Sequence, residues 1–285
     1  MSDSILKLED VCYRYADGTR ALDGCSLAIR RGARTAVLGA NGAGKTTMFL
    51  HLNGILRPTA GQVLCEGTPL DYSRHGMRRL RSRVGMVFQN PDSQLFSASV
   101  REDISFGPMN LGLEEAAVRQ RVEEALCAVG MADSADKPVH NLSYGQKKRV
   151  CIAGVLAMQP EIVVLDEPMA GLDAAMQDEL TTILEKLHSG GMTIVVATHD
   201  LDFAYGWADE SVVMDAGRLL AHGPPAEILR QKEVQSTLGA APLVEEITRS
   251  LSLIGIDLRA KGYLPRSKKE LLKAISDYAI QEGKP

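Results

Sequence analysis

The sequence of 285 residues lacks long apolar runs, a secretory signal and an excess of one charge. No apolar run approaches the ~18 residues of a membrane-spanning helix. The N-terminus MSDSILKLED has neither the charged nor the apolar region of a signal peptide. The 32 Lys and Arg against 36 Asp and Glu leave a formal net charge of -4, which gives no reason to expect a nucleic-acid partner. We expect a peripheral protein at the cytoplasmic face of a membrane, held there by a partner, or a cytosolic one.

Paired cysteines and clustered histidines are also missing. The five cysteines are far apart, odd in number and without a CxxC pair, which argues against a disulfide framework and against a zinc site. The six histidines are scattered as well. If the function of this protein involves a metal ion, we therefore expect that the chain itself does not bind that ion. The cysteines are Cys12, Cys25, Cys65, Cys127 and Cys151.

What the sequence does contain is an alternation of strand-like and helix-like segments. A helix is expected after Lys45, with Met48, Phe49, Leu52 and Ile55 on one face. Strands that alternate with helices predict a mostly parallel sheet covered on both faces. The strand-like segments are 5–15, 25–32, 34–39, 62–67, 84–88, 162–166 and 193–198.

Residues 90–159 read as mostly helical and interrupt this alternation. Ser99 to Glu102 forms a capping-box pattern, and valines and leucines recur at helical spacing after it. We expect a core of 1–89 and 160–237 with 90–159 as a helical subdomain. A small C-terminal extension, 238–285, ends in an amphipathic piece, and we assign it to dimer contacts through Leu271, Leu272 and Ile275.

A phosphate-binding loop follows the expected strand 34–39. Gly39 to Thr46 reads G-x-x-x-x-G-K-T and opens a helix. Its glycines let backbone amides turn toward a β-phosphate, Lys45 reaches the β and γ oxygens, and the Thr46 hydroxyl can ligate Mg²⁺. The sequence therefore predicts an α/β fold with a P-loop NTPase core, and we also expect an N-terminal antiparallel β part.

An acidic pair ends the buried strand 162–166. Asp166 is placed to hold Mg²⁺ through water, and Glu167 to orient and deprotonate an attacking water. A run of apolar residues followed by two acids is weak evidence alone, because strand ends are often acidic. Together with the phosphate loop it indicates nucleotide hydrolysis.

The segment LSYGQKKRV, 142–150, starts a further helix with Ser143 as N-cap. Its donors cluster at the positive end of the helix, where an anion is stabilised. Two interpretations stay open at this point. Ser143 either only satisfies the amides of the first turn or is aimed at an anion.

With both phosphate motifs identified, the chain resembles the ATP-binding cassette family over about residues 5–235. Gln89 matches the Q-loop glutamine, 170–173 (AGLD) resembles the D-loop and His199 the switch histidine. Tyr15 stands where an aromatic residue stacks on adenine. The resemblance implies that ATP is sandwiched between two chains, with the segment at Ser143 meeting the γ-phosphate held by the partner.

Each of these matches has a plainer interpretation. Gln89 could be a surface loop residue, Asp173 could merely cap the next helix, and His199 could be a hydrogen-bonded histidine near a strand end. Tyr13 competes with Tyr15 for the adenine.

The segments LSYGQKKRV, 89–96 (QNPDSQLF) and 100–108 (VREDISFGP) resemble the ATPases of energy-coupling factor transporters, most closely the cobalt-transport type. Tyr144 departs from the usual glycine. Such importers combine two ATPases with a transmembrane coupling protein and a substrate-specific membrane component, and take up cobalt, nickel or vitamins. The segment after Gln89 would receive the coupling protein's cytoplasmic helices, or would be only a solvated loop.

The resemblance implies a homodimeric ATPase that uses ATP and Mg²⁺ to drive import, with cobalt ions as the expected cargo and no nucleic acid as a partner. The implied site residues are Tyr15, Gly39, Asn41, Gly42, Ala43, Gly44, Lys45, Thr46, Thr47, Ser143, Gly145, Gln146 and Asp173 for nucleotide binding; Lys45, Gln89, Glu167 and His199 for catalysis; Thr46, Gln89 and Asp166 for Mg²⁺; and Asp92, Gln94, Leu95 and Phe96 for partner docking.

Two rival functions remain. A soluble cassette ATPase could act on nucleic acid or ribosomes, but the sequence has no long coiled-coil insertion, no second cassette in tandem and no basic patch. A nucleotide-dependent scaffold without turnover is disfavoured by Glu167.

Overall fold

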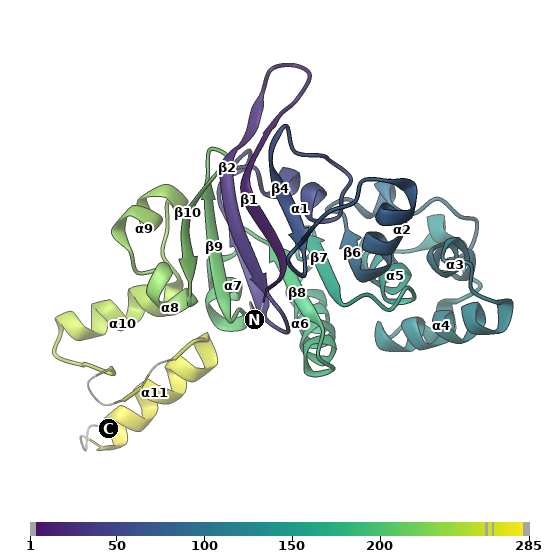
Figure 1. The fold of residues 1–285 in the computed structure, drawn as a ribbon. Coiled ribbons are helices and arrows are strands. Elements are labelled where there is room, and N and C mark those ends of the chain that lie inside the picture. The colour runs from purple at the N-terminus through teal and green to yellow at the C-terminus, as the bar shows by residue number, and fades with distance from the viewer. Residues whose placement is uncertain (1–3, 260–261, 264, 282–285) are drawn as a thin grey trace.

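The computed structural model describes residues 4–259, 262–263 and 265–281, and its strands form two sheets (Figure 1). The first sheet is antiparallel, with the strand order β2-β1-β4-β5. This sheet confirms the expected N-terminal antiparallel part. Its strands are β1 (Ser4–Arg14), β2 (Arg20–Arg30), β4 (Ala60–Cys65) and β5 (Thr68–Pro69).

The second sheet has six strands in the order β10-β9-β3-β8-β7-β6. All neighbours are parallel except β10, which pairs antiparallel with β9. The mostly parallel sheet is therefore confirmed, although β9 and β10 were not among the strands expected from sequence. The strands are β3 (Arg34–Leu38), β6 (Val84–Val87), β7 (Ile162–Asp166), β8 (Thr193–Ala197), β9 (Glu210–Asp215) and β10 (Arg218–Gly223).

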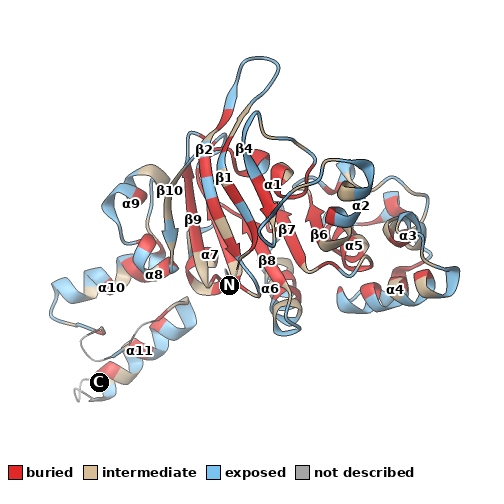
Figure 2. Cartoon of the chain, viewed as in Figure 1, coloured by how far each residue is buried: buried red, intermediate tan, exposed pale blue. Residues whose placement is uncertain are grey.

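The central strands are apolar along their whole length because both faces of the sheet are covered. On β7, Val164 belongs to a core cluster shared with β1, β2 and α1 (Lys45–Leu52), whereas Val163 and Leu165 belong to a second cluster formed with the helices of the other face. Figure 2 shows these strands as a continuous buried layer. The sheet is thus a rigid support for the loops that follow its strands.

Helix α1 is shorter than the sequence pattern suggested. Met48, Phe49 and Leu52 are buried as expected, but the helix ends at Leu52 and Ile55 is 44% exposed. The expectation for Ile55 was therefore wrong. Its amide hydrogen bonds to the Leu50 carbonyl in the turn that leaves the helix at Gly54, where φ is 67°.

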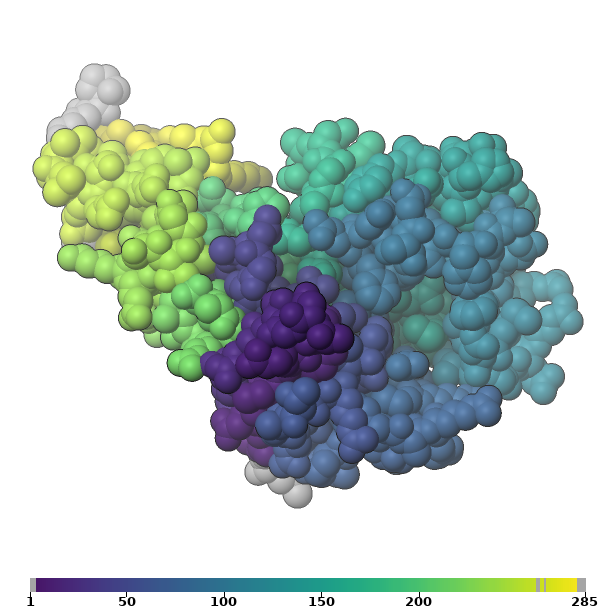
Figure 3. Space-filling model, turned by 90° about the horizontal axis from the view of Figure 1, so that it is seen from above, coloured from purple at the N-terminus to yellow at the C-terminus, as the bar shows by residue number. Residues whose placement is uncertain are grey.

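Residues 90–159 contain three helices, α3 (Val100–Asn110), α4 (Glu115–Ala128) and α5 (Tyr144–Leu156), which pack on one another. The capping box of Ser99 and Glu102 is present at the start of α3. With α2 (Arg74–Arg83) these helices lie at one end of the molecule, opposite the C-terminal helices (Figures 1 and 3).

The remaining helices are α6 (Ala174–Ser189), α7 (Leu201–Trp207), α8 (Pro225–Ile228), α9 (Lys232–Leu238), α10 (Leu243–Leu253) and α11 (Lys268–Gln281). No helix in the described ranges is long and apolar enough to cross a bilayer.

The C-terminal extension is attached to α7. The Glu245 carboxylate, on α10, accepts hydrogen bonds from Tyr205, Arg230 and Arg259. Arg266 donates to the carbonyls of Tyr205 and Ala208 at the end of α7. Helix α7 begins directly after His199 and Asp200. The extension therefore contacts the helix that follows His199, a predicted site residue.

Candidate functional site

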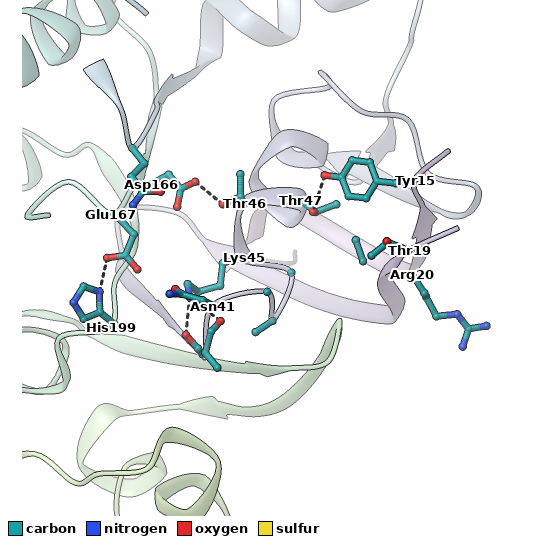
Figure 4. Close-up of a pocket in the computed structure, with 17 residues that line it drawn as sticks. Tyr15, Thr19, Arg20, Asn41, Lys45, Thr46, Thr47, Asp166, Glu167 and His199 are labelled. Carbon is teal, nitrogen blue, oxygen red and sulfur yellow. Dashed lines mark hydrogen bonds and ion pairs between the residues drawn. The ribbon is translucent and has the colours of Figure 1, made fainter. Parts of the chain in front are cut away.

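A cleft of about 550 Å³ opens where β3 meets α1 (Figure 4). This volume lies within the range of ligand pockets. The structure brings together in it most of the residues that the sequence motifs singled out, although these come from distant parts of the chain. The lining residues are Tyr15, Thr19, Arg20, Ala21, Gly39 to Thr47, Gln89, Asp166, Glu167 and His199.

The loop between β3 and α1 is held open by glycine. Gly44 has a φ of 102°, and a Cβ on it would lie 2.6 Å from the Ala21 carbonyl oxygen, so no other residue fits. Lys45 is buried, and its ammonium donates to the carbonyls of Gly39 at 2.6 Å and Ala40 at 3.2 Å. The Lys45 side chain is therefore folded back over the loop, where a phosphate would bind.

Thr46 and Asp166 meet across the cleft, since the Thr46 hydroxyl donates to Asp166 Oδ2 at 2.6 Å. Burial raises the pKa of the Asp166 carboxyl, and the hydrogen bond from Thr46 and the nearby Lys45 oppose that shift. A hydroxyl and a carboxylate are hard oxygen ligands that fit Mg²⁺. The described ranges contain no group of three or more His, Cys, Asp or Glu that could hold a metal ion.

Glu167 and His199 form the second polar contact of the cleft. His199 Nδ1 lies 2.9 Å from Glu167 Oε2, the glutamate being buried and the histidine side chain 75% exposed. Glu167 has a φ of 46°, uncommon for a residue other than glycine. Its amide donates to the Ala197 carbonyl on β8. The contact fixes the direction of the carboxylate at the edge of the cleft (Figure 4).

The two competing tyrosines have different surroundings. Tyr15 lines the cleft, and its hydroxyl lies 3.0 Å from Thr47 Oγ1. Tyr13 packs edge-on against buried His51, with ring centres 4.9 Å apart, and is not among the residues that line the cleft. Of the two tyrosines, Tyr15 is therefore the one that lines the cleft.

Thr19, Arg20 and Ala21 line the cleft, although no sequence motif indicated them. Thr19 ends the turn between β1 and β2, and the other two residues begin β2. This part of the chain reaches the phosphate loop because the Asp23 amide donates to the Gly217 carbonyl and the Gly217 amide to the Ala43 carbonyl. Such proximity depends on sheet packing, and no local pattern could have indicated it.

Four predicted nucleotide-binding residues lie outside the cleft. Ser143 is exposed at the start of α5, in a capping box with Gln146, and Asp173 caps α6 by accepting from the Met176 amide at 2.9 Å. Gly145 lies against Met176, so the two helix starts are neighbours. The capping roles considered for Ser143 and Asp173 are thus present, and both residues remain exposed to solvent.

The predicted docking segment borders a second cleft of about 730 Å³ between α2, α3 and α5. Phe96 is 64% exposed and packs edge-on against Phe106, which is 51% exposed. Arg74, Arg78 and Arg81 of α2 also line it. We call this the docking cleft. Its lining combines basic and apolar side chains with one acidic residue, Asp103.

The other three residues predicted for docking make contacts within their own chain. Gln94 accepts from the Phe88 amide and donates to the Cys151 carbonyl, although it also lines the docking cleft. Asp92 pairs with Lys147 at 2.7 Å, and Leu95 is partly buried against the core. Phe96 is therefore the member of the segment most available to a partner.

Comparison with known proteins places these features in context. The family model described as ABC transporter matches residues 22–170. A Methanothermobacter thermautotrophicus protein named energy-coupling factor transporter ATP-binding protein EcfA is 46% identical over 272 residues, 95% of this chain and 88% of that protein. A Rhodobacter capsulatus protein named cobalt import ATP-binding protein CbiO is 47% identical, with 92% of each covered.

Among solved structures, cbiO1 of Clostridium perfringens, described as part of the ABC transporter complex cbiONQ, is similar with a TM-score of 0.75 and 46% sequence identity. The similarity covers 89% of this chain and 98% of that one. The likeness therefore extends over nearly the whole of the described fold.

Proposed function

Since this chain belongs to the ABC transporter family and is an ATPase of the energy-coupling factor type, we propose that it energises a membrane importer of cobalt ions. The observation that carries the hydrolytic role is the cleft that gathers the phosphate loop with Asp166, Glu167, Gln89 and His199. The proposal of cobalt rests on the relative named for cobalt import. Nickel or a vitamin is the alternative cargo, carried by related importers of the same type.

In this mechanism the backbone amides of Gly42 to Thr46 and the Lys45 ammonium bind the β- and γ-phosphates. Thr46, Gln89 and Asp166 would hold Mg²⁺, which supplies charge neutralisation at the phosphate oxygens. Glu167 orients the attacking water and takes its proton, and His199 holds the Glu167 carboxylate in place through the 2.9 Å contact. Tyr15 covers the adenine.

We further propose that two copies of the chain close over the nucleotides. Ser143, Gly145, Gln146 and Asp173 lie outside their own cleft, at neighbouring helix starts. The amides at the start of α5 form a positive helix end suited to a γ-phosphate. A second copy facing the cleft would supply that end, so a homodimer suffices for two complete sites.

The docking cleft supports attachment to a membrane partner. An exposed aromatic pair beside a hollow of this size is typical of a surface that receives a helix. We propose that the coupling protein of the importer binds there, with a substrate-specific membrane component completing the assembly. The chain would then lie peripherally at the cytoplasmic face of the membrane.

The test is uptake by cells that express the chain with its membrane partners. We expect ATP-dependent accumulation of radioactive cobalt that disappears with Glu167→Gln. Accumulation of nickel or a vitamin instead would redirect the cargo and leave the ATPase role intact. A chain that sediments with ribosomes and not with membranes would favour the soluble rival.

A further inference from the structure

Lys148 lies buried beneath the loop that carries Glu167. Its side chain belongs to α5, one turn after Tyr144, and the residue is only 3% exposed. The ammonium donates to the Glu167 carbonyl at 2.9 Å and to the Pro168 carbonyl at 2.8 Å. These two bonds join the start of α5 directly to the backbone of the residue that we assign to proton transfer.

Burying a lysine at this position costs free energy. Removing an ammonium from water disfavours the charged form, and burial lowers the pKa of Lys148 to about 8. An apolar side chain would avoid this desolvation but would remove the ammonium donor from two buried carbonyls, of which only the Glu167 carbonyl would keep another donor, the Ala170 amide. The lysine therefore contributes something that packing alone would not: two directed bonds to the Glu167–Pro168 segment.

Tyr144 reinforces the same connection. Its ring lies against Gly171, where an added Cβ would come within 2.9 Å of the Tyr144 ring. Lys148 Nζ stands 5.4 Å from the centre of that ring, so the two side chains form one layer on a single face of α5. This layer contacts the loop near both of its ends, at Glu167 and at Gly171.

The backbone of Glu167 depends on such support. Its φ of 46° is unfavourable for a residue with a Cβ and persists only when surrounding groups hold it. The Ala197 carbonyl holds the amide, and Lys148 together with the Ala170 amide holds the carbonyl. Because the carboxylate direction follows from this backbone, losing one support would misplace the group that faces the water.

We propose that Lys148 is a positioning residue for ATP hydrolysis, which ties the α5 end that carries Ser143 to the backbone of Glu167 in the same chain. The proposal rests on the hydrolytic role proposed for Glu167. Through these two hydrogen bonds, a shift of α5 when it contacts the nucleotide of a second copy would move Glu167, the general base in the site of its own chain.

The test compares Lys148→Met with Lys147→Met in the purified protein. Methionine keeps the length of either side chain but removes the donor. Lys147, the next residue on the helix, pairs with Asp92 at the surface instead. We expect Lys148→Met to lower kcat about ten- to a hundredfold, since small misplacements of catalytic groups have effects of that size. KM for ATP and the melting temperature should change little, and Lys147→Met should stay within about twofold of the parent in kcat.

Lys148→Gln provides a second variant, because its amide can still donate to one carbonyl. Its kcat should fall between the parent and Lys148→Met. A parallel loss of kcat, ATP affinity and melting temperature in both Lys148 variants would overturn the proposal, because a general structural defect would then account for it. Unchanged kcat in both would overturn it as well.

Combining Lys148→Met with Glu167→Gln separates this inference from the role of Glu167. When one residue acts through another, removing both costs little more than removing the second alone. We expect less than about a twofold further loss in the double variant. Full turnover in Glu167→Gln alone would refute the proposed base, whereas a normal Glu167→Gln defect with fully additive losses would refute only the link through Lys148.

Discussion

At the residue scale, the cleft is arranged around hydrogen bonds that a nucleotide would exchange for its own. Lys45 donates to two loop carbonyls, and Thr46 donates to Asp166. The Glu167 carboxylate, by contrast, is already held by His199 from the solvent side. The phosphate-binding groups would therefore rearrange on binding, while the proposed base keeps its partner.

Glu167→Gln tests the base. The amide keeps the shape of the side chain but cannot take a proton, and positioned proton transfer contributes ~10² to 10⁴ in rate. We expect turnover to fall by that order while ATP binding persists and a closed dimer accumulates. Phosphate release and size-exclusion chromatography with MgATP would measure both. Near-normal ATPase activity in the folded variant would contradict the assignment.

Tyr15→Ala and Tyr13→Ala form a matched pair for the adenine site. Tyr15 lines the cleft, so its loss should weaken ATP binding about 10- to 100-fold, as expected for lost stacking. Tyr13 packs on His51, so its loss should lower the melting temperature and leave ATP affinity nearly unchanged. Titration with a fluorescent ATP analogue and thermal unfolding would separate them. The reverse pattern would move the role to Tyr13.

At this scale the sequence predicted the position of side chains best where they sit within one contiguous motif. The run from Gly39 to Thr46 sets its own loop geometry, and Asp166 and Glu167 directly follow a strand, so their place at the sheet edge was predictable. Lys148 could not be recognised. Nothing in the segment 147–149 (KKR) distinguishes the buried Lys148 from the half-buried Lys147, because the burial of Lys148 arises when α5 packs against the loop after β7.

At the element scale, the structure departs from the sequence pattern where tertiary packing decides. Strand β10 is partly exposed throughout, and β9 carries the polar residues Glu210, Ser211 and Asp215, so neither reads as a clear buried run. Both form because β9 adds to the edge of β3 and β10 to that of β9. Helix α5 was easier to predict from the sequence, because its capping box and its apolar second half are local signals.

Phe96→Asp tests the docking cleft. The ring is exposed beside Phe106, so a carboxylate there should cost the free subunit little stability while opposing an apolar partner surface. We expect normal ATP binding and loss of membrane recruitment and uptake. Membrane flotation of the co-expressed complex would measure recruitment. Met109→Asp, exposed on the same helix as Phe106 and outside the docking cleft, is the control, and normal recruitment of a folded Phe96→Asp protein would contradict the proposal.

The C-terminal extension allows a prediction about stability. A chain ending at residue 240 loses Glu245 and Arg266, which leaves Tyr205 and the α7 carbonyls without those partners. We expect a lower melting temperature for the shortened chain, and a smaller decrease of the same kind for Arg266→Ala, whose loss removes only the carbonyl bonds. An unchanged melting temperature in both would show that the extension does not support α7.

The same extension was assigned to dimer contacts, and its residues are divided between two environments. Leu271 is buried within its own chain, and Ile275 packs partly against the core, so Leu271 faces no partner surface. Leu272 is 56% exposed and remains open to a second copy. Dimerisation of the chain ending at residue 240, followed without nucleotide, would show that the extension is not needed for association.

At the scale of the whole molecule, Ser143 lies outside the cleft of its own chain, and we proposed that it completes the cleft of a second copy. Lys45→Ala and Ser143→Arg should each inactivate a homodimer. Mixed together on a Glu167→Gln background, they should form heterodimers with one intact site and one doubly damaged site. We expect one trapped ATP per heterodimer and almost none in either parent, counted with radioactive ATP.

The alternative outcome is equally definite. If Ser143 only caps its own helix, Ser143→Arg costs about 1 kcal/mol of stability and mixing rescues nothing. Absence of trapped ATP in heterodimers shown to be folded would therefore refute the shared site. The mixture with wild-type chains is the control for heterodimer formation.

The placement of Ser143 outside its own cleft also has a consequence for the rate law of the enzyme. If half of each site comes from a second copy, as proposed, the specific activity of the free chain rises with protein concentration until all copies are paired. Dilution should therefore lower turnover per chain. Two chains held side by side on a membrane scaffold would escape that dilution, because the scaffold replaces bulk concentration with a high local one. ATP would then be hydrolysed mainly by chains that are held in pairs at the membrane, where cargo can cross.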